Sequence, residues 1–154
     1  MIRMNPRHAR SIRWSLGLAL GLWALSASAI APPGQYSIPG DGTVHDTKTG
    51  LVWQQVVAPG TSTWNLAGAY CVGLSLAGGG WRLPSVKELM TLVDFTVTSG
   101  ATIDATAFPS TPANWFWSSS PVAGNSSSAW AVNFYHGNAS DFDVGATHQV
   151  RCVR

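Results

Sequence analysis

Oxygen-bearing side chains gather near the C-terminal end of the chain, where Asn138, Asp141 and Asp143 follow one another closely. Carboxylate and amide oxygens are the ligands that Ca²⁺ takes in proteins, which raises the hypothesis of a calcium site. An acidic turn before a strand gives the same pattern, and we favour that interpretation. We therefore predict no metal here and keep the three residues as candidate ligand-binding residues.

The histidines give no indication of a metal or catalytic site. His45, His136 and His148 do not have the spacing of a zinc ligand set. The sequence also contains no readable Ser/His/Asp or Cys/His signature. We accordingly predict no catalytic residue, no cofactor and no metal, and we expect a protein that is not an enzyme.

Aromatic side chains are the other candidates for recognition. Trp115 and Tyr135 each stand next to a predicted loop, where a ring can face solvent and stack on a sugar. We therefore add both to the candidate ligand-binding residues. The remaining tryptophans after the N-terminal segment are expected in the core: Trp53, Trp64, Trp81, Trp117 and Trp130.

Residues 1–29 are typical of a secretory signal peptide. Arginines precede an apolar run from Trp14 to Leu25, and Ala27, Ser28 and Ala29 give the small-x-small pattern of a cleavage site. The run is shorter than the about 20 residues of a membrane-spanning helix, so we expect no stable membrane span after cleavage. The protein is predicted to be exported, to the periplasm, the extracellular space or the cell surface.

Removal of residues 1–29 changes the net charge. The rest of the chain has five basic and seven acidic residues, a net charge of −2 instead of +2. The basic residues are scattered, so nucleic acid is not an expected partner. Residues 30–42 form a Pro/Gly-rich leader, and residues 43–154 are long enough for one domain.

Cys71 and Cys152 both lie in the part predicted to be exported. An oxidising compartment favours a disulfide between them. In the chain-entropy model such a bond contributes roughly 4–5 kcal/mol. Two buried free thiols are the alternative at this point.

The segment "WRLPSVKEL", residues 81–89, predicts a structural corner. Ser85 and Glu88 have the spacing of a capping box, Leu83 and Leu89 are placed for a hydrophobic staple, and Pro84 favours an extended Leu83. Arg82 has no such local role. Either it contacts a ligand or, as we favour, it pairs with a nearby carboxylate.

The elements that position these residues indicate an α+β fold. Strands are expected at 43–45 and 51–54 around a turn at Asp46–Gly50, with helices from Trp64 and over 86–93. The stripe of the first helix is Trp64, Ala67, Cys71 and Leu74, and Gly78–Gly80 ends its segment. Residues 94–114 have no clear period, which is typical of a functional loop or a surface excursion. Strands follow at 114–120, 129–135 and 140–145, with 121–128 as a loop and 148–154 as the terminal strand.

Seven of these segments together resemble the Lcl C-terminal domain family. They are, in order, "TGLVWQ", "TWNLAGAYC", "WRLPSVKEL", "FP", "WFWSSS", "AWAVNF" and "VRCVR". The resemblance implies a variant of the C-type lectin-like fold, in which a disulfide commonly ties the first helix to the last strand. It also implies an adhesin-like role, with glycosaminoglycans as one ligand class.

The chain lacks the sequence features of two kinds of glycan binding known for this fold. It lacks the basic patch that a sulfated glycan needs, and it lacks the Glu-Pro-Asn, Gln-Pro-Asp and Trp-Asn-Asp triplets of calcium-dependent sugar binding. We predict an exported, non-catalytic module that binds a glycan or a surface protein. The alternatives are a structural or assembly subunit of a cell-surface structure and, with less support, an enzyme related to the formylglycine-generating group, which "WRLPSVKEL" also resembles.

Overall fold

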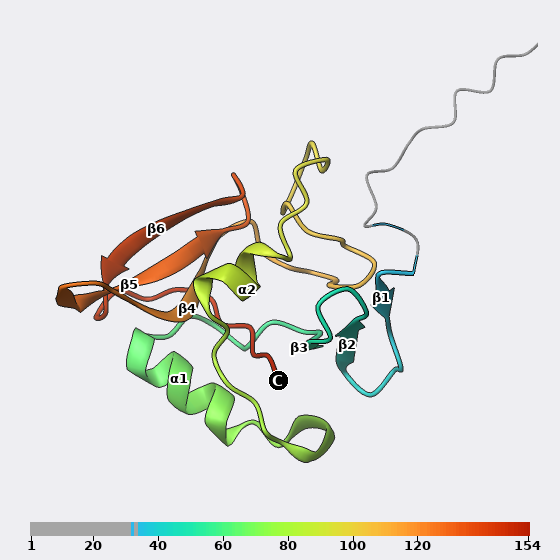
Figure 1. The fold of residues 1–154 in the computed structure, drawn as a ribbon, viewed down its shortest axis with the longest axis horizontal. Helices are drawn as coiled ribbons and strands as arrows, with labels where there is room; N and C mark the ends of the chain where they lie inside the picture. Colours follow the sequence, from blue (N-terminus) through green and yellow to red (C-terminus); the bar gives the residue numbers. More distant parts are fainter. Residues whose placement is uncertain (1–31, 33) are drawn as a thin grey trace, which may run out of the picture.

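The computed structural model describes residue 32 and residues 34–154. The predicted signal peptide lies outside these residues and stays a prediction. The described chain forms two small antiparallel sheets and two α-helices, which confirms the α+β class (Figure 1).

The first sheet has the order β1-β2-β3, with β1 at Tyr36–Ser37, β2 at Thr43–Asp46 and β3 at Val52–Gln54. The predicted hairpin is confirmed: Asp46 is buried, and its carboxylate accepts hydrogen bonds from Lys48 N at 2.9 Å and Thr49 Oγ1 at 2.8 Å. Strand β1 falls in the segment predicted as a leader, and Tyr36 pairs with Asp46. Part of that segment is therefore built into the sheet.

The second sheet has the order β4-β5-β6, with β4 at Trp115–Val122, β5 at Asn125–Asn133 and β6 at Asn138–Asp143. The prediction of a loop over 121–128 is wrong, because β4 and β5 run on through it to a tight turn. Gly124 supplies the positive φ of 76° that this turn requires. Small polar residues have low strand propensity, and the pairing of neighbouring strands outweighs that preference here.

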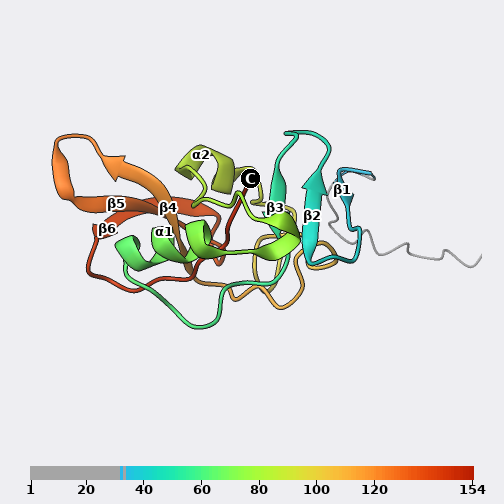
Figure 2. The same cartoon turned by 90° about the horizontal axis from the view of Figure 1, so that it is seen from below.

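The two helices lie on opposite faces of the second sheet (Figure 2). Helix α1, Trp64–Gly73, places Ala67 and Cys71 against Ala129, Ala131 and Trp117. Helix α2, Val86–Met90, packs its Leu89 side chain into a second apolar cluster. That cluster includes Leu92, Phe116, Val132 and Phe134.

Both helices are shorter than predicted. Helix α1 ends at Gly73, before the expected Gly78–Gly80, and a 3₁₀ turn, η1 at Leu76–Gly78, follows it. Thr63 occupies the N-cap of α1, but its side chain makes no capping hydrogen bond. Helix α2 ends at Met90, and the hydroxyl of the C-cap residue Thr91 donates to the Glu88 carbonyl at 2.7 Å.

The C-terminal segment connects the two sheets. Cys152 O accepts from Gln54 N of β3 and Gln149 O accepts from Trp117 N of β4, and Val153 exchanges two hydrogen bonds with Arg82. The C-terminus consequently lies between the sheets in both views (Figures 1 and 2). The predicted terminal strand is thus an extended, buried segment held by isolated bridges.

The predicted disulfide is confirmed. Cys71 of α1 and Cys152 of the C-terminal segment are fully buried and joined, with an S–S distance of 2.02 Å and a sequence separation of 81 residues. The bond therefore ties the first helix to the segment on which both sheets depend.

The long stretch 94–114 is only partly a surface excursion. Thr102, Ile103, Asp104, Ala107 and Phe108 within it are buried. Ile103 and Phe108 belong to the same apolar cluster as α2. The stretch has no period because single side chains, rather than one face of an element, enter the core.

Candidate functional site

Arg82 has the structural role that the sequence favoured. Its guanidinium donates to both carboxylate oxygens of Glu88, at 2.8 and 2.6 Å. The same carboxylate accepts from the N–H of Ser85 at 2.8 Å, and Ser85 Oγ accepts from Glu88 N at 3.2 Å, so the predicted capping box is confirmed. The hydrogen bonds from Arg82, with those from Ser85, lower the pKa of Glu88 to about 2.

The corner is also fastened to the second sheet. Pro84 is buried, and its carbonyl accepts from Ser119 N at 2.7 Å. Val86 N donates to the hydroxyl of Ser120 at 3.0 Å. The predicted staple is wrong, since Leu83 and Leu89 belong to different apolar clusters. The corner therefore holds the fold, and the polar groups of Arg82, Ser85 and Glu88 are engaged with one another.

The five predicted ligand-binding residues lie along the second sheet. Trp115 is half-buried, with its ring edge on Phe142 at 4.8 Å between centroids. Tyr135 is 59% exposed in the turn after β5. Asn138, Asp141 and Asp143 are exposed along β6, and Asp143 accepts from Gly145 N at 2.8 Å. The structure spreads these side chains over the sheet and gathers them around no pocket that it describes.

Histidine and acidic side chains form no metal centre in the described part of the chain, where no group of three such ligands is close enough to hold an ion. The His148 ring packs against the rings of Trp117 and Phe142, with its centroid 4.5 Å from each of theirs. Burial lowers the pKa of His148, so its neutral form is favoured. His148 is therefore part of the core packing.

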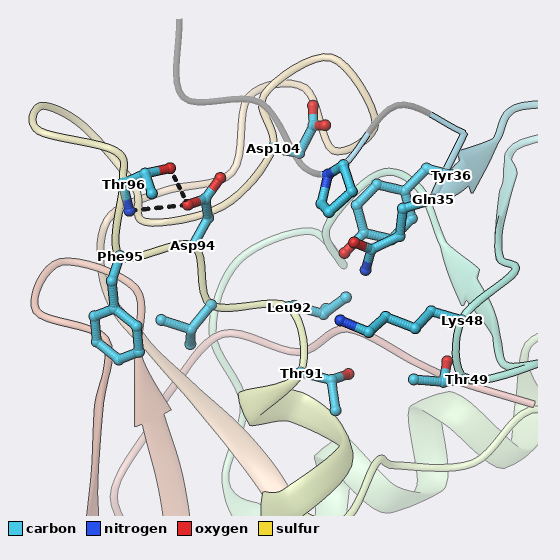
Figure 3. A pocket seen from close by; sticks show the side chains of 12 residues that line it. Gln35, Tyr36, Lys48, Thr49, Thr91, Leu92, Asp94, Phe95, Thr96 and Asp104 are labelled. Atoms are coloured by element: carbon cyan, nitrogen blue, oxygen red, sulfur yellow. Dashed lines mark hydrogen bonds between the residues drawn. The ribbon is translucent and has the colours of Figure 1, made fainter. Parts of the chain in front are cut away.

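An open pocket of about 810 Å³ lies elsewhere, where strand β1, the β2–β3 turn and the segment after α2 meet (Figure 3). Its lining residues are Pro32, Gln35, Tyr36, Lys48, Thr49, Thr91, Leu92, Val93, Asp94, Phe95, Thr96 and Asp104. The pocket combines apolar and aromatic surface with a few polar groups, which is the usual make-up of a small-ligand site.

Backbone pairing and local turns position the pocket side chains. Tyr36 is held by its pairing with β2, and its ring meets the edge of Phe108 at 5.2 Å. Asp104 Oδ1 accepts from Thr106 N at 2.8 Å and Ala107 N at 3.0 Å. Asp94 Oδ1 accepts from both the N–H and the hydroxyl of Thr96.

Phe95 presents an aromatic ring at the rim of the pocket and is 72% exposed. One edge of the ring lies over the turn between β5 and β6, so closely that a Cβ atom on Gly137 would come within 2.6 Å of Phe95 Cε1. The ring is thus held at one edge while most of its surface stays open to a ligand.

Sequence reasoning did not single out these residues. They come from four separated stretches, and Tyr36 stands in a segment whose composition indicates a leader. One signal pointed toward them: the unpatterned stretch 94–114 was expected to be either a functional loop or a surface excursion, and it supplies Asp94, Phe95, Thr96 and Asp104.

Arg151 is a buried charged residue, as are Asp46 and Asp104, and the sequence did not reveal its burial. Its side chain is fully buried and lies over the Phe108 ring at 4.6 Å. It donates to Thr111 Oγ1 at 2.9 Å and to the Gln55 carbonyl at 3.3 Å, while Nε and Nη1 have no partner among the described residues. Burial lowers the pKa of Arg151 to about 9. Since it lines none of the pockets described, we assign it to the core.

A family model, described as the Lcl C-terminal domain, matches residues 42–154. The chain therefore belongs to the Lcl C-terminal domain family. A search of curated proteins finds no match. None of the helices among the described residues has both the length and the apolar character that crossing a bilayer requires.

Proposed function

We propose that this protein is an exported, non-catalytic module that recognises a glycan through the pocket beside the first sheet, in an adhesin-like role. The observation that carries the proposal is the pocket itself, which places the rings of Tyr36 and Phe95 beside polar side chains from four parts of the chain. We further infer a C-type lectin-like relationship for the fold, supported by the disulfide that ties α1 to the C-terminal segment.

The chemistry of the lining suits a sugar. An exposed aromatic face packs against the apolar face of a pyranose ring. Carboxylates accept hydrogen bonds from sugar hydroxyls, while the amide of Gln35 and the ammonium of Lys48 donate them. Phe95 provides the ring, and Asp94 and Asp104 provide the acceptors.

The disulfide supports a non-catalytic role over formylglycine-type chemistry. That chemistry in the related group uses a cysteine pair near the substrate. In the described part of this chain both cysteines are buried in one disulfide and no thiol is free. Export is supported in the same way, because a disulfide persists in an oxidising compartment.

A role in assembly is the second candidate, and one surface favours it. The outward side of α1 carries Leu66 and Val72, which are 62% and 76% exposed. The helix also contains no charged residue. An apolar surface of this kind suits contact with another protein of a cell-surface structure.

The test is a glycan array that compares the purified protein with matched variants, with calcium and with a chelator. Phe95→Ala and Gln35→Ala change the pocket, whereas Tyr135→Ala and Asp141→Asn change the sheet surface predicted from sequence. The proposal expects binding that survives the chelator and is weakened only by the first pair. Weakening by the second pair alone would move the site to the sheet, and a blank array would favour the assembly role.

A further inference from the structure

The pocket carries more negative than positive charge. Its lining includes two carboxylates, Asp94 and Asp104, and one cation, Lys48. Lys48 is exposed and pairs with neither carboxylate, since the salt bridge found in the described part of the chain joins Arg82 to Glu88. Both carboxylates line the pocket, and no salt bridge in the described part of the chain gives either of them a positive partner.

Each carboxylate is fixed by one oxygen and leaves the other unpaired. Thr96 holds Oδ1 of Asp94, while Oδ2 is buried and has no hydrogen-bond partner among the described residues. The turn at Thr106 holds Oδ1 of Asp104, whose side chain is only 9% exposed, and none of the described residues donates to its Oδ2. A buried carboxylate oxygen without a donor is costly, so a rotation of Asp94 that brings Oδ2 to a donor on a bound ligand gains the difference.

The neighbouring Tyr36 reports the same negative potential. Burial raises the pKa of its hydroxyl, and the charges of Asp46, Asp104 and Asp94 raise it further, against a smaller opposite effect of Arg151. The Tyr36 hydroxyl consequently stays protonated and is a hydrogen-bond donor. A ligand group in this pocket meets acceptors, one neutral hydroxyl and a field that favours cations.

We propose that the pocket selects an amino sugar and pairs its protonated primary amine with Asp94 and Asp104. This inference rests on the proposed function and names the ligand class of the same site. An ammonium group has three donors and no acceptor, which matches two carboxylates with free oxygens. A sulfated or carboxylated glycan would instead meet repulsion, so the glycosaminoglycan class implied by the family resemblance does not fit this pocket.

Two tetrasaccharides that differ only in N-acetylation, which removes the positive charge of each amine, test the inference. Calorimetry measures binding of the purified protein to a β-1,4-linked glucosamine tetramer and to its N-acetylated form, at about pH 6, where amines are protonated and carboxylates ionised. Asp94→Asn and Asp104→Asn remove the charge while keeping the Oδ1 acceptor on which the local turns depend. Asp141→Asn, exposed on β6 and outside the pocket, is the matched control.

The amino form is expected to bind at least tenfold more tightly than the acetylated form. Each pocket variant should weaken its binding about tenfold, the effect of one charge-assisted hydrogen bond, and the control should not. The inference would be overturned if the acetylated form bound as tightly as the amino form or more tightly, or if the amino form did not bind. It would also be overturned if a lysine tetrapeptide, which carries ammonium groups but no sugar, bound more tightly than the amino form. If the acetylated form binds and Phe95→Ala weakens it, the pocket is still a glycan site. If a bound glycan ignores Phe95→Ala, the proposed function itself is wrong.

Discussion

Replacement of Glu88 tests the account of the corner at residues 82–88. The Glu88 carboxylate accepts four hydrogen bonds, two from Arg82 and two from Ser85, at distances from 2.6 to 2.9 Å. Glu88→Ala removes all of them. Glu88→Gln keeps an acceptor for the capping box and removes the charge that pairs with Arg82.

The magnitude follows from two separate contributions. The return bond of a capping box is worth about 1 kcal/mol. A pKa held at about 2 instead of 4.5 corresponds to about 3 kcal/mol for a fully buried pair, and the 48% exposure of the Arg82 side chain reduces this to roughly 1 kcal/mol. We expect Glu88→Ala to lower the free energy of unfolding by about 2 kcal/mol and Glu88→Gln by about 1 kcal/mol.

Urea denaturation at several pH values is the assay, with the exposed Lys87→Ala as a control expected to change stability by less than about 0.5 kcal/mol. The folded-state pKa of Glu88 is depressed, so its contribution is complete above the ordinary pKa of 4.5 and is lost as the pH falls toward 2. The difference in free energy of unfolding between the unchanged protein and Glu88→Gln should therefore shrink as the pH falls from 4.5 toward 2. The reasoning would be refuted if that difference did not depend on pH, or if Glu88→Ala lowered the free energy of unfolding by less than about 0.5 kcal/mol.

Further predictions concern the β5–β6 turn, the disulfide and the independence of corner and pocket. In thermal melts, Gly137→Ala should lower stability by about 2 kcal/mol more than a surface change, because φ is 71° and the new Cβ would meet Phe95. Gly124→Ala has a similar φ of 76° but open space around the new Cβ, so it should lower stability by only about 1 kcal/mol. Equal losses for the two variants would contradict the contact with Phe95. Reduction of the Cys71–Cys152 bond should lower stability by roughly 4–5 kcal/mol in urea titrations, and an unchanged midpoint would contradict its stabilising role. Glycan binding by folded Glu88→Gln should equal that of the unchanged protein on the array, and a selective loss would place the corner in the site.

Local signals in the sequence predicted local structure well. The capping box is complete within residues 85–88, so its spacing alone predicts the start of α2. The stripe of α1 and the buried tryptophans Trp53, Trp81 and Trp117 follow from periodicity and size. Two cysteines in one domain leave only one possible disulfide.

Features that depend on distant partners were not predictable in the same way. The hairpin around Gly124 forms from serines with low strand propensity because its two strands pair with each other, and Ser127 and Ser128 pair with Val144 and the end of β6. Arg151 alternates with Val150 and Cys152, which predicts an outward side chain, yet both sides of this segment are covered. The pocket needs β1, the β2–β3 turn and residue 104 side by side, and no spacing in the sequence records that arrangement.

The most direct test of the pocket as the binding site is an NMR titration of ¹⁵N-labelled protein with the glycan that gives the strongest array signal. The account predicts that shifted amides cluster at residues 35–36, 48–49, 91–96 and 104. A cluster along β6 and the turn at Tyr135, with the pocket unchanged, would contradict it.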